Sequence, residues 1–210
     1  MEIFLIRHGE VDHHYQGRFY GGMDVDLSNN GRDQADAAGR LLAEVPLDAI
    51  YSSPLGRAGF GADRVLHWQQ ASGGRKPRLQ VLEELREIDR GRWSGMLKSE
   101  VLEQWPQDLD SHWADLESWR GHQGESLGDL RNRVWRGLET LLADHQETDR
   151  LALVAHLFPI SAILAWVEPA RERRSLRQWM DWQIQTGSVS KLSGEGRNWQ
   201  VDFVGKVPGE

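Results

Sequence analysis

Cysteine is absent from this chain of 210 residues. Disulfide frameworks and thiolate metal sites both need cysteine, so the sequence excludes them. No stretch approaches the roughly 20 apolar residues that a membrane-spanning helix requires. The opening residues MEIFLIRHGE also lack the basic segment of a secretory signal, and charge returns as early as Arg7. We therefore expect a cytoplasmic protein with no membrane partner.

Positive charge is also scarce. The chain carries 25 Lys and Arg residues against 32 Asp and Glu residues, which gives a net charge of -7. Nucleic acids and anionic surfaces bind basic faces, so we expect no nucleic-acid partner. A phosphorylated ligand would have to meet positive charge concentrated in one pocket. Hydrophobic residues make up 39% of the chain, enough for a core, and the length fits a single domain over residues 1–210.

Short apolar segments alternate with segments of helical period. Strands are expected at residues 3–6, 49–52, 79–82 and 151–155. Helices are expected after Ser28, from Ser53-Pro54 with Pro54 in the first helical position, after Ser126, and from Phe158-Pro159. Residues 188–192 and 199–204 are typical of a hairpin. The alternation predicts an α/β fold with a mostly parallel central sheet flanked by helices.

Residues 94–124 depart from this pattern. The segment is acidic, shows no clear period, and contains Trp105, Trp113 and Trp119. We expect it to form a helical cap that is inserted into the α/β fold. The segment is expected to pack on itself, with binding of a ring-bearing ligand as the alternative, and its position makes it the natural cover of a pocket.

Two of the predicted strands lead into histidines. His8 and His156 follow strands directly, and Arg57 lies at the start of the helix that follows a third strand. Ligands of open α/β sheets bind beyond the carboxyl ends of the strands. The topology alone therefore brings three side chains that suit phosphate to one edge of the sheet, where a helix N-terminus also favours an anion.

Six blocks resemble, in order, the motifs of the histidine phosphatase superfamily, which includes the cofactor-dependent phosphoglycerate mutases. They are LIRHGE (5–10), RFYGGMDVDLS (18–28), YSSPLGRA (51–58), LREIDRGRWSG (85–95), GESLGDLRNRV (124–134) and LVAH (153–156). The blocks together are far more specific than the RHG triplet alone. The resemblance implies phosphoryl transfer through a phosphohistidine, which requires neither a metal nor an organic cofactor.

The resemblance also assigns roles. His8 is the implied nucleophile, with its other ring nitrogen donating to a backbone carbonyl, because neutral imidazole attacks well near pH 7. Arg7, Arg57 and His156 are implied to surround the phosphate, the arginines with planar forked donors and His156 as an imidazolium that the dianion favours. Glu87 is implied to act as general acid and then as base. This mechanism needs the two histidine rings close together and open to solvent.

Composition alone does not select Glu87 from its acidic neighbours Glu83, Glu84 and Asp89. On the substrate side, the loop after the first motif offers four contact residues by position. These are His14, Arg18, Tyr20 and Gly21. The mutases of the superfamily carry asparagine at the position of His14.

Two departures from the superfamily pattern stand next to His156. Leu157-Phe158-Pro159 replaces residues that are usually small, and Ser161 replaces a common arginine. Pro159 has no backbone N–H to offer. The catalytic groups themselves are all present, so the departures bear on substrate class and rate.

The leading hypothesis is a phosphomonoesterase that acts on a small phosphorylated metabolite. The loop at 18–28 and the chain length are similar to the ribazole phosphatases of the cobalamin pathway. One alternative is a phosphoglycerate mutase, and another is a catalytically poor member that binds or scaffolds.

Other features have plainer interpretations. His13-His14 is interpreted as part of an ordinary loop rather than as a metal site, for want of a placed carboxylate. A basic cluster is interpreted as a solvated helix face, and it consists of Arg171, Arg173, Arg174 and Arg177. Trp179 and Trp182 are expected in the core or at a homodimer contact.

Overall fold

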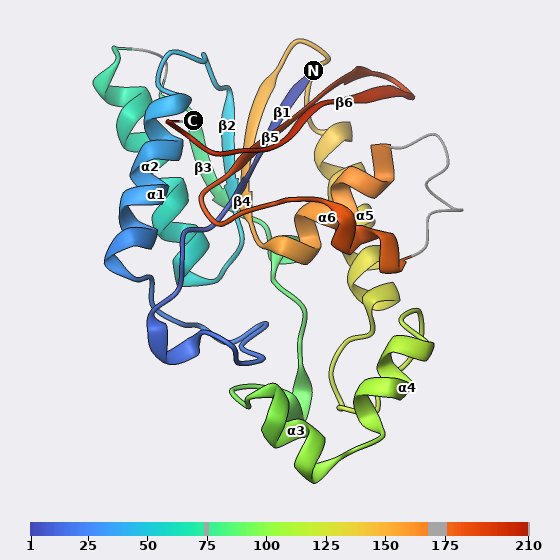
Figure 1. Cartoon of the computed structure of the whole chain (residues 1–210). Coiled ribbons are helices and arrows are strands. Elements are labelled where there is room, and N and C mark those ends of the chain that lie inside the picture. Colours follow the sequence, from blue (N-terminus) through green and yellow to red (C-terminus); the bar gives the residue numbers. More distant parts are fainter. Residues whose placement is uncertain (74–75, 168–175, 210) are drawn as a thin grey trace.

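The computed structural model describes residues 1–73, 76–167 and 176–209, and these residues form one six-stranded sheet with helices on both faces (Figure 1). The strand order is β3-β2-β4-β1-β5-β6. The strands are β1 (Glu2–Arg7), β2 (Ala49–Ser52), β3 (Arg78–Val81), β4 (Arg150–Ala155), β5 (Val189–Glu195) and β6 (Asn198–Lys206). Strands β1 to β4 are mutually parallel, whereas β5 runs antiparallel to β1 and pairs with β6 as a hairpin. The predicted α/β class, mostly parallel sheet and hairpin are confirmed.

The helices divide between the two faces of the sheet. The longer helices are α1 (Asn29–Leu41), α2 (Gly56–Ala71), α5 (Leu127–Ala143) and α6 (Leu157–Val167). Figure 1 shows α1 and α2 on one side of the strands and α5 and α6 on the other. Side chains of a strand alternate between faces, so in β1 Phe4 and Ile6 join the core under α1 and α2, while Ile3 and Leu5 join the core under α5 and α6.

Two of the helix starts follow the sequence signals and one does not. Ser28 Oγ accepts the Gly31 amide at 2.9 Å, and Ser126 forms a capping box with Asp129. The prediction that Pro54 is the first helical residue is wrong, because α2 begins at Gly56. The Ser53 hydroxyl accepts the Leu55 amide and also contacts His156, so Ser53 and Pro54 form a turn before the helix.

The predicted cap is present as two short helices, α3 (Lys98–Gln104) and α4 (Asp108–Ala114). Figure 1 shows them beyond the carboxyl ends of the parallel strands. Trp93 is completely buried among Val101 and Leu109 in a small core of its own. Each helix has only seven residues, too few for a period to show in the sequence. Trp105 and Trp119 pack against this core as predicted, whereas Trp113 is 41% exposed.

The remaining elements are short 3-10 helices. They are η1 (His13–Tyr15), η2 (Glu83–Leu85), η3 (Gly91–Trp93) and η4 (Leu176–Asp181). Trp179 in η4 is buried in the main core, and Trp182, which follows η4, packs against that core, as expected for core residues. Arg171, Arg173 and Arg174 lie outside the described residues. Within those residues, no helix is long and apolar enough to cross a membrane.

Candidate active site

His8 and His156 lie at the ends of two paired strands, β1 and β4. The His8 amide donates to the Ala155 carbonyl at 3.0 Å, which holds the two strand ends in register. The ring centroids are 5.0 Å apart, so the expected proximity of the two rings is confirmed. The expectation that they open to solvent is wrong. His8 is 2% exposed and His156 is 0% exposed, because both follow central strands, β1 and β4, that have a neighbouring strand on each side.

The His8 ring has a defined tautomer. Its Nδ1 lies 2.6 Å from the Gly9 carbonyl, and since a carbonyl can only accept, Nδ1 carries the proton and Nε2 presents a lone pair. Burial, followed by the charges of Arg57 and Arg7, holds the pKa of His8 well below its usual value. The ring is therefore a neutral imidazole at pH 7 with Nε2 free, which is the form a nucleophile needs.

Gly9 explains why glycine follows the histidine. A Cβ at this position would lie 1.9 Å from the Gly31 carbonyl oxygen in the first turn of α1. The contact is reciprocal, because a Cβ at Gly31 would lie 2.0 Å from the Glu10 carbonyl oxygen. The motif thus places the loop after His8 directly against the N-terminus of α1.

Arg57, which is buried, and Arg7, which is half-buried, bring two positive charges to His8. Arg7 Nη1 donates to the Ile184 carbonyl at 2.6 Å, and Arg57 donates to the carbonyls of Met23 at 2.6 Å and Gly21 at 2.7 Å. In each guanidinium the Nε is buried and has no hydrogen-bond partner among the described residues. A buried donor without a partner costs about 1–3 kcal/mol, so both groups have capacity for an anionic acceptor.

His156 is positioned by a residue that sequence reasoning missed. Its Nε2 lies 2.7 Å from Ser53 Oγ, at the carboxyl end of β2, while its Nδ1 is buried and unpartnered within the described chain. Burial, then His8, Arg57 and Arg7, hold the pKa of His156 well below its ordinary value. A neighbouring anion would have to supply the charge that turns this ring into an imidazolium. The adjacent serines after β2 were the available signal for Ser53.

Glu87 is buried beside the arginines. Only 7% of its surface is exposed, and its Oε1 accepts the Ile88 amide at 2.9 Å. Burial raises the pKa of the Glu87 carboxyl, against the opposing effects of the Ile88 amide, Arg90 and Arg57. The raised pKa favours a carboxyl that can donate a proton closer to neutral pH.

Arg90 is a second residue that sequence reasoning missed. It is 8% exposed. Its guanidinium lies over the rings of Phe19 and Phe158, at 5.8 Å and 5.1 Å from their centroids. Its position three residues after Glu87, in the 85–95 block, was the only signal in the sequence.

Only two of the four contact residues predicted in the loop after the first motif lie close to Arg57. Tyr20 lies under the Arg57 guanidinium at 5.3 Å, and the Gly21 carbonyl accepts from Arg57. Gly21 has φ +35°, and a Cβ there would lie 2.4 Å from the Ile88 carbonyl oxygen. These two predicted residues are therefore close to Arg57, although the tight backbone approach of Gly21 is to the segment after Glu87.

The other two predicted contact residues have their side chains engaged elsewhere. His14 is exposed and its Nδ1 lies 2.6 Å from Asp12 Oδ1. Arg18 donates to the Gly95 carbonyl at 2.9 Å and lies 3.6 Å from Glu100, both on the cap side. The geometry does not bring either side chain to the histidine pair.

Asp12 supplies the carboxylate that the sequence interpretation of His13-His14 lacked. The ligand atoms of Asp12, His13 and His14 lie within 4.8 Å of one another, so the three could hold a metal ion. All three belong to the loop around η1, and both histidines are exposed. This cluster shares no contact with His8 or His156 in the described structure.

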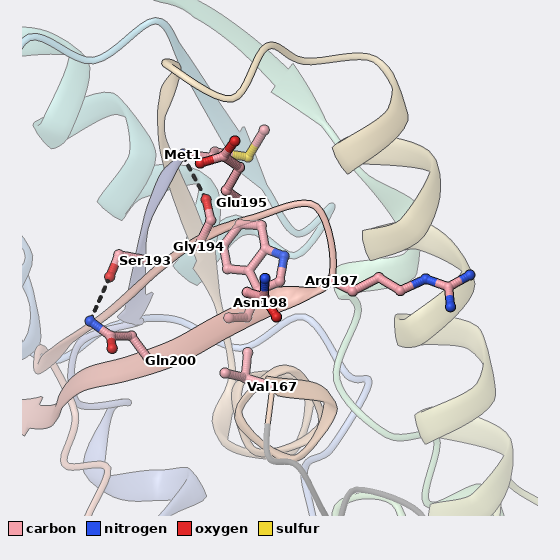
Figure 2. Close-up of a pocket in the computed structure, with 9 residues that line it drawn as sticks. Met1, Val167, Ser193, Gly194, Glu195, Arg197, Asn198 and Gln200 are labelled. Atoms are coloured by element: carbon pink, nitrogen blue, oxygen red, sulfur yellow. Dashed lines mark hydrogen bonds between the residues drawn. The ribbon is translucent and has the colours of Figure 1, made fainter.

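Two cavities adjoin the buried site. One of about 280 Å³ is lined by Arg57 together with Asp24, Arg32 and Phe60. The other, of about 200 Å³, is lined by Arg90, Phe19 and Phe158. A larger hollow of about 680 Å³ lies on the β5–β6 hairpin beside Met1 (Figure 2), at the opposite end of β1 from His8.

Known proteins share this arrangement of motifs. The model of the histidine phosphatase superfamily (branch 1) matches residues 3–206. The chain belongs to this superfamily. The match covers the C-terminal hairpin as well as the motif-bearing part, so the departures after His156 lie inside the family's own domain.

Relatives of this histidine phosphatase superfamily chain include phosphatases and mutases. It is 34% identical over 165 residues to phosphoserine phosphatase 1 of Hydrogenobacter thermophilus, covering 78% of this chain and 74% of the relative. It is 31% identical to the bisphosphoglycerate-dependent phosphoglycerate mutase of Bartonella bacilliformis, covering 79% and 81%. The crystal structure of a putative alpha-ribazole phosphatase from Escherichia coli superimposes with a TM-score of 0.83 over 98% of this chain and 96% of that one. At 22% identity that likeness shows the fold alone.

Proposed function

We propose that this chain is a phosphomonoesterase that hydrolyses a small phosphorylated metabolite through a phosphohistidine on His8. The observation that carries the proposal is the defined tautomer of His8, with Nδ1 bound to the Gly9 carbonyl and Nε2 free. Beside it, Arg7, Arg57 and His156 each have a buried polar nitrogen with no partner in the described chain. An incoming phosphoryl group has oxygens to satisfy these nitrogens.

The first half-reaction forms the phosphohistidine. His8 Nε2 attacks phosphorus, the P–O bond to the alcohol breaks, and Glu87 delivers its proton to the departing oxygen. Arg7 and Arg57 stabilise charge on the equatorial oxygens, which is the main demand of phosphoryl transfer. The neutral state of His8 and the raised pKa of Glu87 fit these two roles.

The second half-reaction regenerates the enzyme. The Glu87 carboxylate accepts a proton from a water molecule while the oxygen of that water attacks phosphorus, and the P–N bond to His8 breaks. The products are inorganic phosphate and neutral imidazole, and Glu87 has regained the proton that it gave up. No metal or organic cofactor is needed for either step.

Access to the buried histidines has to come through the adjoining cavities. Gly21 and Met23, whose carbonyls hold Arg57, belong to the loop that closes over the site. Movement of this loop or of the cap would open a path to His8, as lids do in many enzymes. A cytoplasmic location belongs to this proposal, and cell fractionation tests it.

Mutase activity is the second candidate, because a mutase is among the relatives. The phosphatase is favoured because His14 stands where the mutases carry asparagine, and because a phosphatase relative matches at 34% identity over 78% of this chain, whereas mutase relatives at 34% identity cover 63% of it. A binding or scaffold role without catalysis is disfavoured by the buried, hydrogen-bonded arrangement around His8.

The test is a screen of phosphorylated metabolites near neutral pH with chelator present. We expect phosphate release and transient labelling of wild-type protein, but not of His8→Ala, by a substrate with radioactive phosphorus. Interconversion of the two phosphoglycerates, primed by the bisphosphate, would establish the mutase instead. Failure to release phosphate from any ester, with no label on His8, would overturn the enzymatic proposal.

A further inference from the structure

The cavity beneath the cap has the character of a leaving-group pocket. It measures about 200 Å³, and its walls include Phe19, Leu109, Leu127 and Phe158. Pockets for drug-sized ligands start at about 300 Å³, so this one suits a single ring or a short branched chain. Arg90 also lines it, and the charge of Arg90 acts on the buried carboxyl of Glu87. Arg90 therefore links this cavity to the proposed proton donor, although Glu87 does not itself line it.

Arg90 is an unusual wall residue for such a cavity. A guanidinium has five N–H donors, yet in the described chain that of Arg90 donates no hydrogen bond and instead lies against the rings of Phe19 and Phe158. The residue is more than nine-tenths buried. Among the described residues, Glu87 is the anion whose charge raises the pKa of Arg90, against the larger effect of burial. The Arg90 nitrogens are not among the fully buried, unpartnered polar atoms of the described residues, so they remain accessible to a ligand.

In the proposed reaction, Glu87 loses its negative charge at one stage. Glu87 has to carry a proton when it protonates the leaving oxygen, and at that stage Arg90 has no anion beside it within the described chain. A substrate anion in the cavity would restore the balance and satisfy the free guanidinium donors.

We infer that the substrate's leaving group has an apolar body that fills this cavity and a carboxylate that binds Arg90. The substrate class is therefore a phosphate ester of a phenol or apolar alcohol that also bears a carboxylate. This inference rests on the proposed phosphatase function. It also gives a role to the departure after His156, because Phe158 builds the wall on which the Arg90 guanidinium lies.

The test uses two aryl phosphates whose leaving groups are equally good. One is the phosphate ester of para-hydroxyphenylpropanoate, and the other is para-propylphenyl phosphate, which lacks the carboxylate. Wild-type protein should prefer the carboxylate ester by about tenfold or more in kcat/KM, since a hydrogen bond to a charged group is worth about 1.5–3 kcal/mol. Arg90→Met should reduce this ratio to near one, and Arg90→Lys should restore part of it.

Arg86→Met is the matched control. Arg86 lies on the same segment, but its side chain reaches solvent and pairs only with Glu83, at 3.4 Å, among the described residues. The same loss of charge there should leave the preference ratio unchanged. Inhibition of wild-type protein by para-hydroxyphenylpropanoate should exceed that by para-propylphenol by a similar factor, and this measurement needs no variant to fold.

The outcomes separate the two proposals. Equal kcat/KM for both esters in wild-type protein overturns the carboxylate inference and leaves the phosphatase standing. An equal loss for both esters in Arg90→Met also overturns it, because Arg90 would then act only through Glu87. Protein that hydrolyses neither ester and takes no label at His8 overturns the phosphatase, and the inference falls with it.

Discussion

Acid should destabilise the cap. His112 and His122 are buried in the cap core, where their rings meet the faces and edges of Trp93 and Trp119. Burial, followed by the charge of Arg90, lowers the pKa of each histidine from 6.5 to about 4. Both rings are therefore neutral in the folded cap over the physiological range.

The sign of the effect follows from linkage. The unfolded cap takes up protons as pH falls through 6.5, whereas the folded cap takes them up only near pH 4, so stability is lost between these values. From pH 7 to pH 5 the loss amounts to about 2 kcal/mol per ring at full burial, and to about 1 kcal/mol when solvent screening is allowed for.

The assay is hydrogen exchange of the α3 and α4 amides at pH 7 and pH 5, with urea unfolding at both values. His112→Phe should remove about half of the pH dependence of cap exchange, since no hydrogen bond of His112 is lost within the described chain. His67→Gln is the control, because it removes an exposed histidine on α2, outside the cap. Cap exchange that changes with pH equally in wild-type and His112→Phe protein would refute the reasoning.

The remaining predictions concern the histidine pocket. His8→Ala should lower turnover by more than about three orders of magnitude, measured by phosphate release. Glu87→Gln should slow alkyl phosphates about a hundredfold or more and nitrophenyl phosphate much less, and an equal loss for both would exclude Glu87 as the acid. Gly21→Ala should lower the free energy of unfolding by about 1–3 kcal/mol in urea titrations, because a Cβ at φ +35° would clash with the Ile88 carbonyl. Unchanged stability would show that the loop changes its conformation to accept the methyl group.

The histidine pair was predictable because it depends on strand ends. Short runs in which the residues facing either side of the sheet are apolar identify β1 and β4. Parallel strands bring the residues that follow them to one edge of the sheet. His8, His156 and Arg57 were placed by that reasoning alone, and the family motifs added Glu87. The start of α2 was misjudged because Pro54 is a good first helical residue by local propensity, whereas the Ser53 contact with His156 is a long-range one.

The misses on the substrate side have the same cause. Counting along the loop placed Arg18 and His14 near the substrate, but their partners are Glu100, Gly95 and Asp12. Arg90 went unnoticed because its surroundings, Phe19 and Phe158, come from segments far apart in the chain. A side chain's direction depends on such contacts, and no short-range pattern records them.

The cap and the histidine pair come from separate parts of the chain. Both histidines stand at the ends of central strands that neighbours hold on either side, whereas α3 and α4 occupy one continuous stretch with a core of its own. Replacing that stretch would change part of the wall of the cavity beneath the cap, which Lys98 and Leu109 help to line, while the strands would keep the two histidines in register. Descendants of such a chain can acquire new substrates by exchanging a single segment, without rebuilding the chemistry.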